Sequence, residues 1–255
     1  MNQTLAKAHY KSALSQKSQQ DQESWLSAEM WNTFPGLIHR FSRRLSKTRS
    51  RTHVCESLEI PHFSLKTLKQ VHGNTIVTVE NDTIGKEQEA DGMLTLGSSV
   101  LLGIKTADCV PILLVAPQQK VVGALHAGWR GTEKAIGSRA IEICAAQWGI
   151  SPAQIWVALG PSIGSCCYQV GREVGEPLFQ LWGDGQSTTW QRQGEKGYLD
   201  LRAINRIQLI QAGVPDAQIQ SVGPCTFCHP NEFTSYRREG PHAGRQLSVI
   251  GWQPN

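Results

Sequence analysis

The stretch that decides the fold begins with Thr106-Ala107-Asp108-Cys109-Val110-Pro111 and ends with Leu125-His126-Ala127-Gly128-Trp129-Arg130-Gly131-Thr132. Between these motifs lie two apolar runs, residues 112–115 and 121–125, separated by turn-forming residues at 117–120. Short apolar runs bounded by turn signals are typical of buried strands, so we predict a β-hairpin. Cys109 lies where the first strand of this hairpin begins, and His126 lies where the second strand ends. Antiparallel pairing then places the thiol and the imidazole at the same end of the sheet.

A third candidate ligand, His72, lies upstream in the polar turn Lys69-Gln70-Val71-His72-Gly73-Asn74, which follows a strand-like run from residue 65 to 71. Two imidazoles and one thiolate are the ligand count of a catalytic zinc, which keeps a fourth position open. We therefore predict that His72, Cys109 and His126 bind Zn²⁺, with Cu²⁺ as the alternative metal.

An anion site is expected directly after the hairpin. A helix capped by Thr132 or a near neighbour is predicted to run to Gln147, with Gly149 after its end. Free backbone N–H groups at its start and the Arg130 guanidinium would converge on a phosphate or a carboxylate. Asp108 has two readings of similar weight: it orients a ligand or accepts a proton, or it caps the backbone where the strand begins.

The remaining pattern predicts an α+β fold with mixed β-sheets layered with helices, in a single domain over residues 34–255. Strands are expected at residues 36–42, 155–159, 219–222 and 245–250. Helices are expected at 170–182 and 201–212, the second with Asp200 as its N-cap and Gly213 after its end. Residues 1–33 are predicted to be a tail or a docking helix, whose apolar residues from Trp25 to Trp31 pack onto the core.

Composition excludes several classes of protein. The chain has 255 residues, 40% of them hydrophobic, and a net charge of only +4, so neither nucleic acid nor membrane is an expected partner. The basic run at residues 39–51 is better explained as a solvated loop than as a polyanion site. An odd number of cysteines, seven, argues against a disulfide scaffold. With no secretory or membrane-length apolar segment, we expect a cytoplasmic protein, with a monomer favoured.

Two cysteine pairs need separate treatment. Cys225-Thr226-Phe227-Cys228-His229 has the spacing of a c-type haem attachment or half of a structural zinc site. No matching pair lies at the usual distance along the chain, so we predict a loop that packs beside the site. Cys166 and Cys167 are expected to be buried thiols rather than a vicinal disulfide.

Six ordered motifs across residues 37–250 resemble the bacterial YfiH family, whose mammalian relative is FAMIN (laccase domain-containing 1). They are Gln70-Val71-His72-Gly73, Ala90-Asp91-Gly92, Thr106 to Pro111, His126 to Gly131, Gly160-Pro161-Ser162-Ile163-Gly164 and Ser235-Tyr236-Arg237-Arg238. The family's usual Ser-Thr-Arg-x-Gly-Gly stretch is replaced here by Phe41-Ser42-Arg43-Arg44-Leu45-Ser46-Lys47, and the segment before His72 is short. A shortened flap predicts altered substrate choice or a more open pocket.

The resemblance implies one zinc ion on His72, Cys109 and His126, the set already reached from ligand chemistry. It also implies purine nucleoside chemistry: phosphorolysis of adenosine, inosine, guanosine and methylthioadenosine, and deamination of adenosine. Purine nucleosides and phosphate would be the small-molecule partners. With those three ligands, Asp108 and Arg130 complete the predicted catalytic set, and the predicted substrate-binding residues are Arg44, Gln70, Asp91 and Arg237.

Three other functions use the same residues. A thiolate–imidazolium pair of Cys109 with a histidine, or a zinc site, would suit an amidase acting on peptidoglycan precursors, in line with the family's description as an editing factor. A copper polyphenol oxidase ranks lower, because multicopper oxidation needs more clustered histidines than eight scattered ones provide. A non-enzymatic binding protein is the remaining alternative.

Overall fold

The computed structural model describes residues 25–44, 54–55, 58, 60, 64–80, 88–97, 100–183 and 189–253. The predicted tail at residues 1–22 and most of the basic run at 39–51 lie outside this part of the chain. So does much of the short segment before His72.

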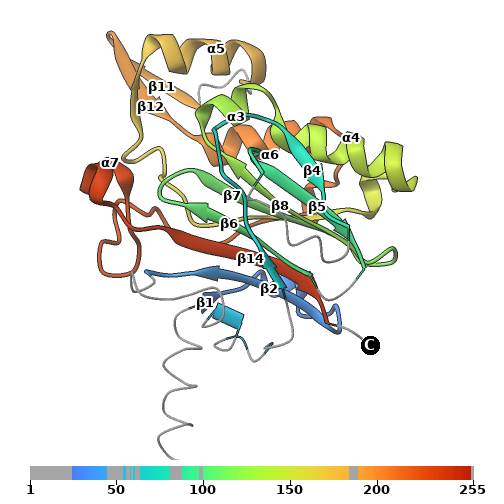
Figure 1. Ribbon diagram of the computed structural model, residues 1–255. Coiled ribbons are helices and arrows are strands. Elements are labelled where there is room, and N and C mark those ends of the chain that lie inside the picture. Colours follow the sequence, from blue (N-terminus) through green and yellow to red (C-terminus); the bar gives the residue numbers. More distant parts are fainter. Residues whose placement is uncertain are drawn as a thin grey trace, which may run out of the picture.

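Three sheets and a set of helices make up the described fold (Figure 1). The strands are β1 (Trp25–Leu26), β2 (Leu37–Ser42), β3 (Ser64–Lys66), β4 (Ile76–Thr78), β5 (Gly92–Leu96), β6 (Val100–Thr106), β7 (Val110–Ala116), β8 (Val121–Ala127), β9 (Trp156–Leu159), β10 (Gln169–Gly171), β11 (Trp190–Gln193), β12 (Lys196–Leu199), β13 (Ile219–Ser221) and β14 (Gln246–Trp252). The helices are α3 (Trp129–Glu133), α4 (Ile136–Trp148), α5 (Arg172–Trp182), α6 (Leu201–Gln211) and α7 (Tyr236–Glu239), with 3-10 turns η1 (Glu29–Trp31), η2 (Pro152–Gln154), η3 (Asp216–Gln218) and η4 (Gly240–His242).

The six-stranded sheet, in the order β13-β9-β7-β8-β5-β4, lies between a five-stranded sheet and the helices. The five-stranded sheet has the order β1-β2-β14-β6-β3, and a small sheet, β10-β12-β11, lies beside α5. Leu113 and Val115 of β7 pack toward the five-stranded sheet, whereas Ile112 and Leu114 belong to the core shared with α4 and α6. Both faces of β7 are therefore buried, which explains its continuous apolar run. The predicted α+β class, with mixed sheets and helices in one domain, is confirmed.

The central hairpin forms as predicted. β7 and β8 pair antiparallel, with Val110 opposite Ala127 and Pro111 opposite His126. Cys109 directly precedes β7, so it lies at the same end of the sheet as His126. Helix α6 also begins as predicted, because the Asp200 side chain accepts a hydrogen bond from the backbone N–H of Ala203 at 2.9 Å.

The helix expected from Thr132 to Gln147 is correct from Ile136 onward but wrong near its start. It begins earlier, with Gly128 as the N-cap of α3, and breaks at Ala135, whose φ is +51°. Thr132 does not act as a cap: its hydroxyl accepts from Asn205 Nδ2 at 2.9 Å, and its carbonyl accepts from Gln208 Nε2 at 2.7 Å. Both bonds join Thr132 to α6. In one straight helix the Thr132 carbonyl would instead have bonded within the helix itself.

Two further expectations needed correction. The strand predicted for residues 65–71 ends at Lys66, because the Gln70 side chain pairs with both backbone groups of Lys105 at 2.7 and 2.9 Å instead of extending the ladder. The hairpin β11–β12 was not predicted at all, since its few buried residues, such as Trp190 and Leu199, stand among polar and glycine residues and form no apolar run.

The segment from Trp25 docks onto the core, as its aromatic residues suggested. Trp31 is fully buried, and its ring meets the His39 ring edge-on at 5.3 Å. His39 Nε2 lies 3.1 Å from the carbonyl oxygen of Ala28, which joins this segment to β2. The boundary between a 1–33 segment and a 34–255 domain stays a prediction.

Candidate metal centre and active site

Three strands and two turns bring His72, Cys109 and His126 together. His72 lies in the turn before β4 with φ +61°, Cys109 lies between β6 and β7, and His126 lies in β8. Their ligand atoms all lie within 4.8 Å of one another, and the two imidazole rings meet edge-on at 4.8 Å. His72 is exposed and His126 is buried, so the group reaches from the interior to the surface.

Asp91 holds this group from behind. Its fully buried carboxylate accepts a hydrogen bond from His126 Nδ1 at 2.8 Å and others from the backbone N–H groups of His72 at 3.0 Å and Gly73 at 2.6 Å. The bond to Nδ1 leaves Nε2 of His126 to face Cys109 and His72. Asp91 was predicted to bind substrate, but it does not line the cavity and its oxygens are already engaged. The geometry is that of a positioning residue.

Electrostatics favour ionised ligands. Burial opposes ionisation of Cys109, but hydrogen bonds from His126 and His72 outweigh it and lower the pKa of the thiol. Burial likewise opposes protonation of His126, yet its bonds to Asp91 and Cys109 raise the pKa of the imidazole. Without metal, the two groups thus favour a thiolate beside an imidazolium.

Gly128 allows the ligands to approach each other. A Cβ at this position would lie 3.1 Å from Cys109 Sγ and 3.2 Å from His72 Cδ2, closer than ordinary carbon contacts. A side chain at residue 128 would therefore press on two of the three ligands, which would have to shift by a few tenths of an ångström.

Asp108 braces a distant loop. The backbone φ of this residue is +88°. Its carboxylate accepts hydrogen bonds from Thr226 Oγ1 at 2.6 Å, Ser235 Oγ at 2.9 Å and the backbone N–H of Arg237 at 2.7 Å. The one backbone group among these donors, the N–H of Arg237, belongs to the first turn of α7 rather than to the strand entrance of Asp108 itself. A role for Asp108 in proton transfer stays a prediction.

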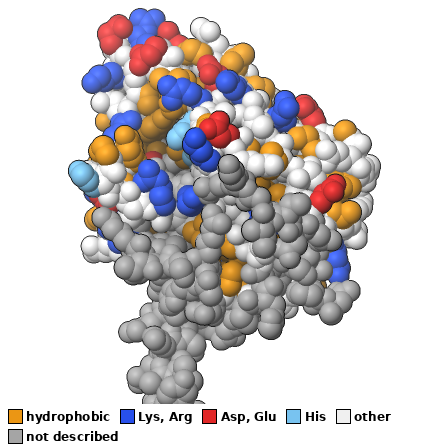
Figure 2. All heavy atoms as spheres, in the orientation of Figure 1, with side chains coloured by type: hydrophobic (Ala, Val, Ile, Leu, Met, Phe, Trp, Pro, Cys, Tyr) orange, Lys and Arg blue, Asp and Glu red, His pale blue; other side chains and the backbone are white. Residues whose placement is uncertain are grey.

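A cavity of about 770 Å³ opens beside the three ligands. Among the described residues lining it, five are basic (Lys69, Lys105, Arg130, Arg237 and Arg245), and Asp108 alone is acidic. Figure 2 shows Lys and Arg side chains gathered around a His side chain on this face of the molecule. The charge balance favours an anionic ligand.

The other predicted substrate-binding residues, together with Arg130 from the predicted catalytic set, divide into two groups. Gln70, Arg130 and Arg237 line the cavity, where the Arg130 guanidinium lies 4.2 Å from the centre of a Trp129 ring. Arg44 does not line it: its guanidinium donates to Glu239 at 2.7 Å and to the Phe233 carbonyl at 3.2 Å.

Sequence reasoning missed the aromatic wall of the cavity. Tyr168 lines it, with the Arg237 guanidinium 5.2 Å from its ring centre, as do Trp129 and Tyr236. Burial and the nearby Cys109 raise the pKa of Tyr168 to about 12, so it stays a neutral phenol. Its only sequence signal was its position directly after Cys166-Cys167.

The chemistry of this donor set fits a zinc ion. Donors on a four-coordinate zinc, with bonds of about 2.0–2.3 Å, lie roughly 3.3–3.8 Å apart. The three ligand atoms are already within 4.8 Å, and the carboxylate behind His126 is a usual support for a zinc-bound imidazole. The same two imidazoles and thiolate also suit copper, so the donor set alone does not identify the metal. It is the sole group of at least three potential ligands in the described residues that contains histidine.

Comparison with known proteins shows the family. A family model described as "Multi-copper polyphenol oxidoreductase laccase" matches residues 26–253. The chain belongs to this family. The predicted resemblance to YfiH proteins is also confirmed, since the crystal structure of a Bacillus licheniformis hypothetical protein YfiH has a TM-score of 0.79 at 27% identity, covering 90% of this chain and 97% of that one.

Curated relatives of the chain carry enzyme names. Purine nucleoside phosphorylase YlmD of Geobacillus stearothermophilus is 35% identical over 84% of this chain and 81% of its own, and its crystal structure has a TM-score of 0.82. Adenosine deaminase RL5, from an unknown prokaryotic organism, is 38% identical over 64% of each chain. These names support an enzyme of the phosphorylase type. In the described residues, no helix is both long enough and apolar enough to cross a membrane.

Proposed function

We propose that this protein is a zinc-dependent purine nucleoside phosphorylase that also deaminates adenosine, with adenosine, inosine, guanosine and methylthioadenosine as substrates. The observation that carries the proposal is the juxtaposition of His72, Cys109 and His126 with a basic, aromatic-walled cavity. The names of the relatives support the substrate class.

The cavity offers groups suited to each of the two substrates. In phosphorolysis an oxygen of phosphate bonds to C1′ of the ribose while the bond from C1′ to the purine breaks, and the purine leaves with the electron pair. Arg130 and Arg237 present guanidinium groups suited to hold phosphate in two contacts. The Trp129 and Tyr168 rings supply flat surfaces for a purine.

A zinc ion on the three ligands would supply a Lewis acid with one coordination position left for substrate or water. The chain itself fixes the orientation of that site. Asp91 selects the tautomer of His126, and the Asp91 bonds to the 72–73 backbone hold the turn that carries His72. Lys105, on β6, also lines the cavity and adds positive charge to it.

One observation favours a second candidate, a thiol amidase acting on cell-wall precursors. Asp91, His126 and Cys109 form a hydrogen-bonded series in which an acid orients a base and the base activates a thiol. The two candidates differ in what protects Cys109. Bound zinc would shield it from iodoacetamide, whereas the amidase would be a metal-free protein with a rapidly alkylated thiol.

The deciding experiment incubates metal-assayed protein with adenosine, with and without phosphate, and resolves the products by mass spectrometry. We expect inosine without phosphate, and with phosphate adenine and ribose 1-phosphate together with inosine or the hypoxanthine that its phosphorolysis gives. Cys109→Ala is assayed beside it, to exclude contaminating enzymes. Cys144→Ala, which removes a buried thiol from α4 outside the site, is the matched control and should retain activity.

Absence of both products from fully zinc-loaded wild-type protein would refute the nucleoside proposal. Equal activity of Cys109→Ala would refute the assignment of the site. Hydrolysis of an amide bond in cell-wall precursors by metal-free protein, with release of an amine and a carboxylate, would support the amidase instead.

A further inference from the structure

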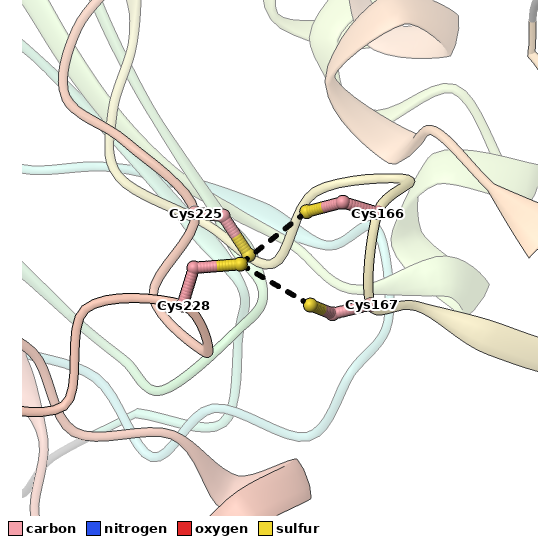
Figure 3. Close-up of side chains that lie close together, drawn as sticks. All are labelled: Cys166, Cys167, Cys225 and Cys228. Carbon is pink, nitrogen blue, oxygen red and sulfur yellow. Dashed lines mark hydrogen bonds between the residues drawn. The ribbon is translucent and has the colours of Figure 1, made fainter.

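A second cluster of potential ligands lies outside the cavity (Figure 3). Cys166 and Cys167 come from the loop between β9 and β10, and Cys225 and Cys228 from the loop after β13. A backbone bridge between Ser162 and Cys225, with Thr226 N–H donating to the Ser162 carbonyl at 3.0 Å, aligns the two loops. No matching pair lies at the usual distance along the chain, but Cys166 and Cys167 lie next to Cys225 and Cys228 in space.

The four sulfur atoms have the spacing of a tetrahedral metal site. Cys228 Sγ lies 3.6 Å from Cys166 Sγ and 3.3 Å from Cys167 Sγ, and all four lie within 4.8 Å of one another. Zinc–sulfur bonds of about 2.3 Å place the sulfurs of a tetrahedral site about 3.8 Å apart. Thiolates on a multi-iron cluster bind different iron atoms and must spread further. One metal ion fits the spacing better.

Packing alone does not account for this cluster. The expectation of two buried thiols is wrong, because Cys166 and Cys228 are exposed and Cys167 and Cys225 only partly buried. Exposed thiols at such distances are vulnerable to oxidation unless something holds them. All four are free in this structure, with no disulfide between them.

The surroundings of the four cysteines suit a set of thiolates, which carries negative charge. The backbone N–H of Gly164 donates to Cys225 Sγ at 3.2 Å, as amides do to metal-bound thiolates. Arg238 Nη1 donates to the carbonyls of Thr226 at 3.0 Å and Phe227 at 2.7 Å, inside the Cys225–Cys228 turn. Arg202 donates to the Gly223 carbonyl at 3.0 Å, just before it. Two cations therefore border a site that would carry four thiolates.

We propose that Cys166, Cys167, Cys225 and Cys228 bind one structural zinc ion that joins the two loops. With four protein ligands the site has no open position, so its role is to hold the fold rather than to bind substrate. Both loops continue to the cavity. Tyr168 directly follows Cys167, while Thr226, Ser235 and Arg237 on the other side attach to Asp108. The ion fixes Tyr168 against Arg237.

The test measures metal content and coordination in the full-length chain. Zinc per chain is determined by mass spectrometry for wild type, Cys109→Ala and the double variant Cys225→Ser/Cys228→Ser. We expect Cys109→Ala to retain one zinc ion, and the double variant to bind one fewer than wild type. Cys55→Ser, a buried thiol outside both clusters, should leave the count unchanged.

X-ray absorption on zinc-loaded Cys109→Ala keeps the proposal testable even if the double variant does not fold. A shell of four sulfurs at about 2.3 Å, without nitrogen, is the expected result. Zinc-free Cys109→Ala, nitrogen ligands in that spectrum, or bound iron with cluster absorption would each overturn the proposal. Because Cys109 is absent from this variant, the result is independent of the nucleoside activity.

Discussion

The two ligand clusters both hold their ligand atoms close together but are built for different tasks. In each, the ligand atoms lie within 4.8 Å of one another. The cluster of His72, Cys109 and His126 mixes nitrogen and sulfur, borders a cavity and has a buried carboxylate behind it. The four-cysteine cluster contains only sulfur and does not line that cavity. The difference teaches that the number of ligands and what lies beside them, rather than their proximity, separates a reactive centre from a structural one.

Their scaffolds differ too. Cys109 and His126 belong to one hairpin, where adjacent strands bring them together. The four cysteines lie on loops that only the folded chain joins. Removal of a ligand from the cluster of His72, Cys109 and His126 should therefore mainly reduce enzymatic activity. Removal of a ligand from the four-cysteine cluster should mainly increase the mobility of the two loops that carry it.

The largest effect is expected from Cys109→Ala. Loss of the thiolate removes one of three ligands, so activity should fall on the order of 10³-fold, about 4 kcal/mol. The far-UV circular dichroism spectrum should not change. Steady-state assays of metal-assayed protein check this, with Cys144→Ala as control; a loss below tenfold would place the chemistry elsewhere.

Asp91→Asn should have the next largest effect. Removing the charge behind His126 weakens its orientation and basicity, and such changes typically cost roughly 10–100-fold in metal affinity or activity. Competition with a zinc-binding dye measures the affinity. The four-cysteine cluster should keep its metal in this variant, and an unchanged affinity at the first site would remove Asp91 from its positioning role. Asp200→Asn, which keeps an N-cap acceptor on α6, is the matched control.

His39 lies outside both ligand clusters, so its titration should change the pH dependence of folding stability and not that of the two ligand clusters. Burial and the adjacent Arg40 lower the pKa of His39 from 6.5 to about 4. Between these values the unfolded chain binds the proton and the folded chain does not, so stability falls with falling pH. From about pH 7.5 to about pH 5 this one group should cost about 2 kcal/mol.

Urea unfolding of wild type and His39→Gln at both pH values isolates that contribution. Glutamine retains a donor for the Ala28 carbonyl but does not titrate in this range. The acid-induced loss of stability should be smaller in the variant by the stated amount. Equal losses in both proteins would show that His39 does not titrate as described.

The smallest effect is expected where the two clusters meet. Thr226→Val keeps the shape of the side chain but deletes the hydroxyl that donates to Asp108 at 2.6 Å. Leaving that carboxylate oxygen unpaired costs about 1–3 kcal/mol of stability. Arg237 should shift slightly, so we expect KM for phosphate to rise up to about tenfold, with kcat little changed.

Thr234→Val is the matched control for this variant. It deletes a hydroxyl in the same loop that donates to Gln246 at 2.9 Å, away from Asp108. Similar KM values for the two variants would mean that the loop transmits nothing specific from the four-cysteine cluster to the cavity.

The sequence predicted the features that depend on strands adjacent to each other in the chain. Apolar runs on both sides of a turn located the β7–β8 hairpin, and with it the pairing that brings Cys109 near His126. The position of His72 followed from its ligand chemistry and from the motif around it. Asp91 was recognised as part of a motif, but its role was assigned to substrate because burial cannot be read from three residues.

Contacts between segments that are far apart in the sequence could not be predicted from the sequence. The four cysteines meet through the pairing of Ser162 with Cys225, which leaves no periodic signal. The break at Ala135 follows from hydrogen bonds that α6 makes to Thr132, again a contact between distant residues. Arg44 looked like a phosphate ligand, but its partner, Glu239, is at the far end of the chain.

Gly128 has a consequence for how this protein can evolve. Because a Cβ there would press on Cys109 and His72, glycine is required only while both ligands hold their places. A gene copy that no longer needed the centre would be released from this requirement, even if its fold were still under selection. Glycine at residue 128, next to intact ligands, thus marks a copy that has kept its chemistry.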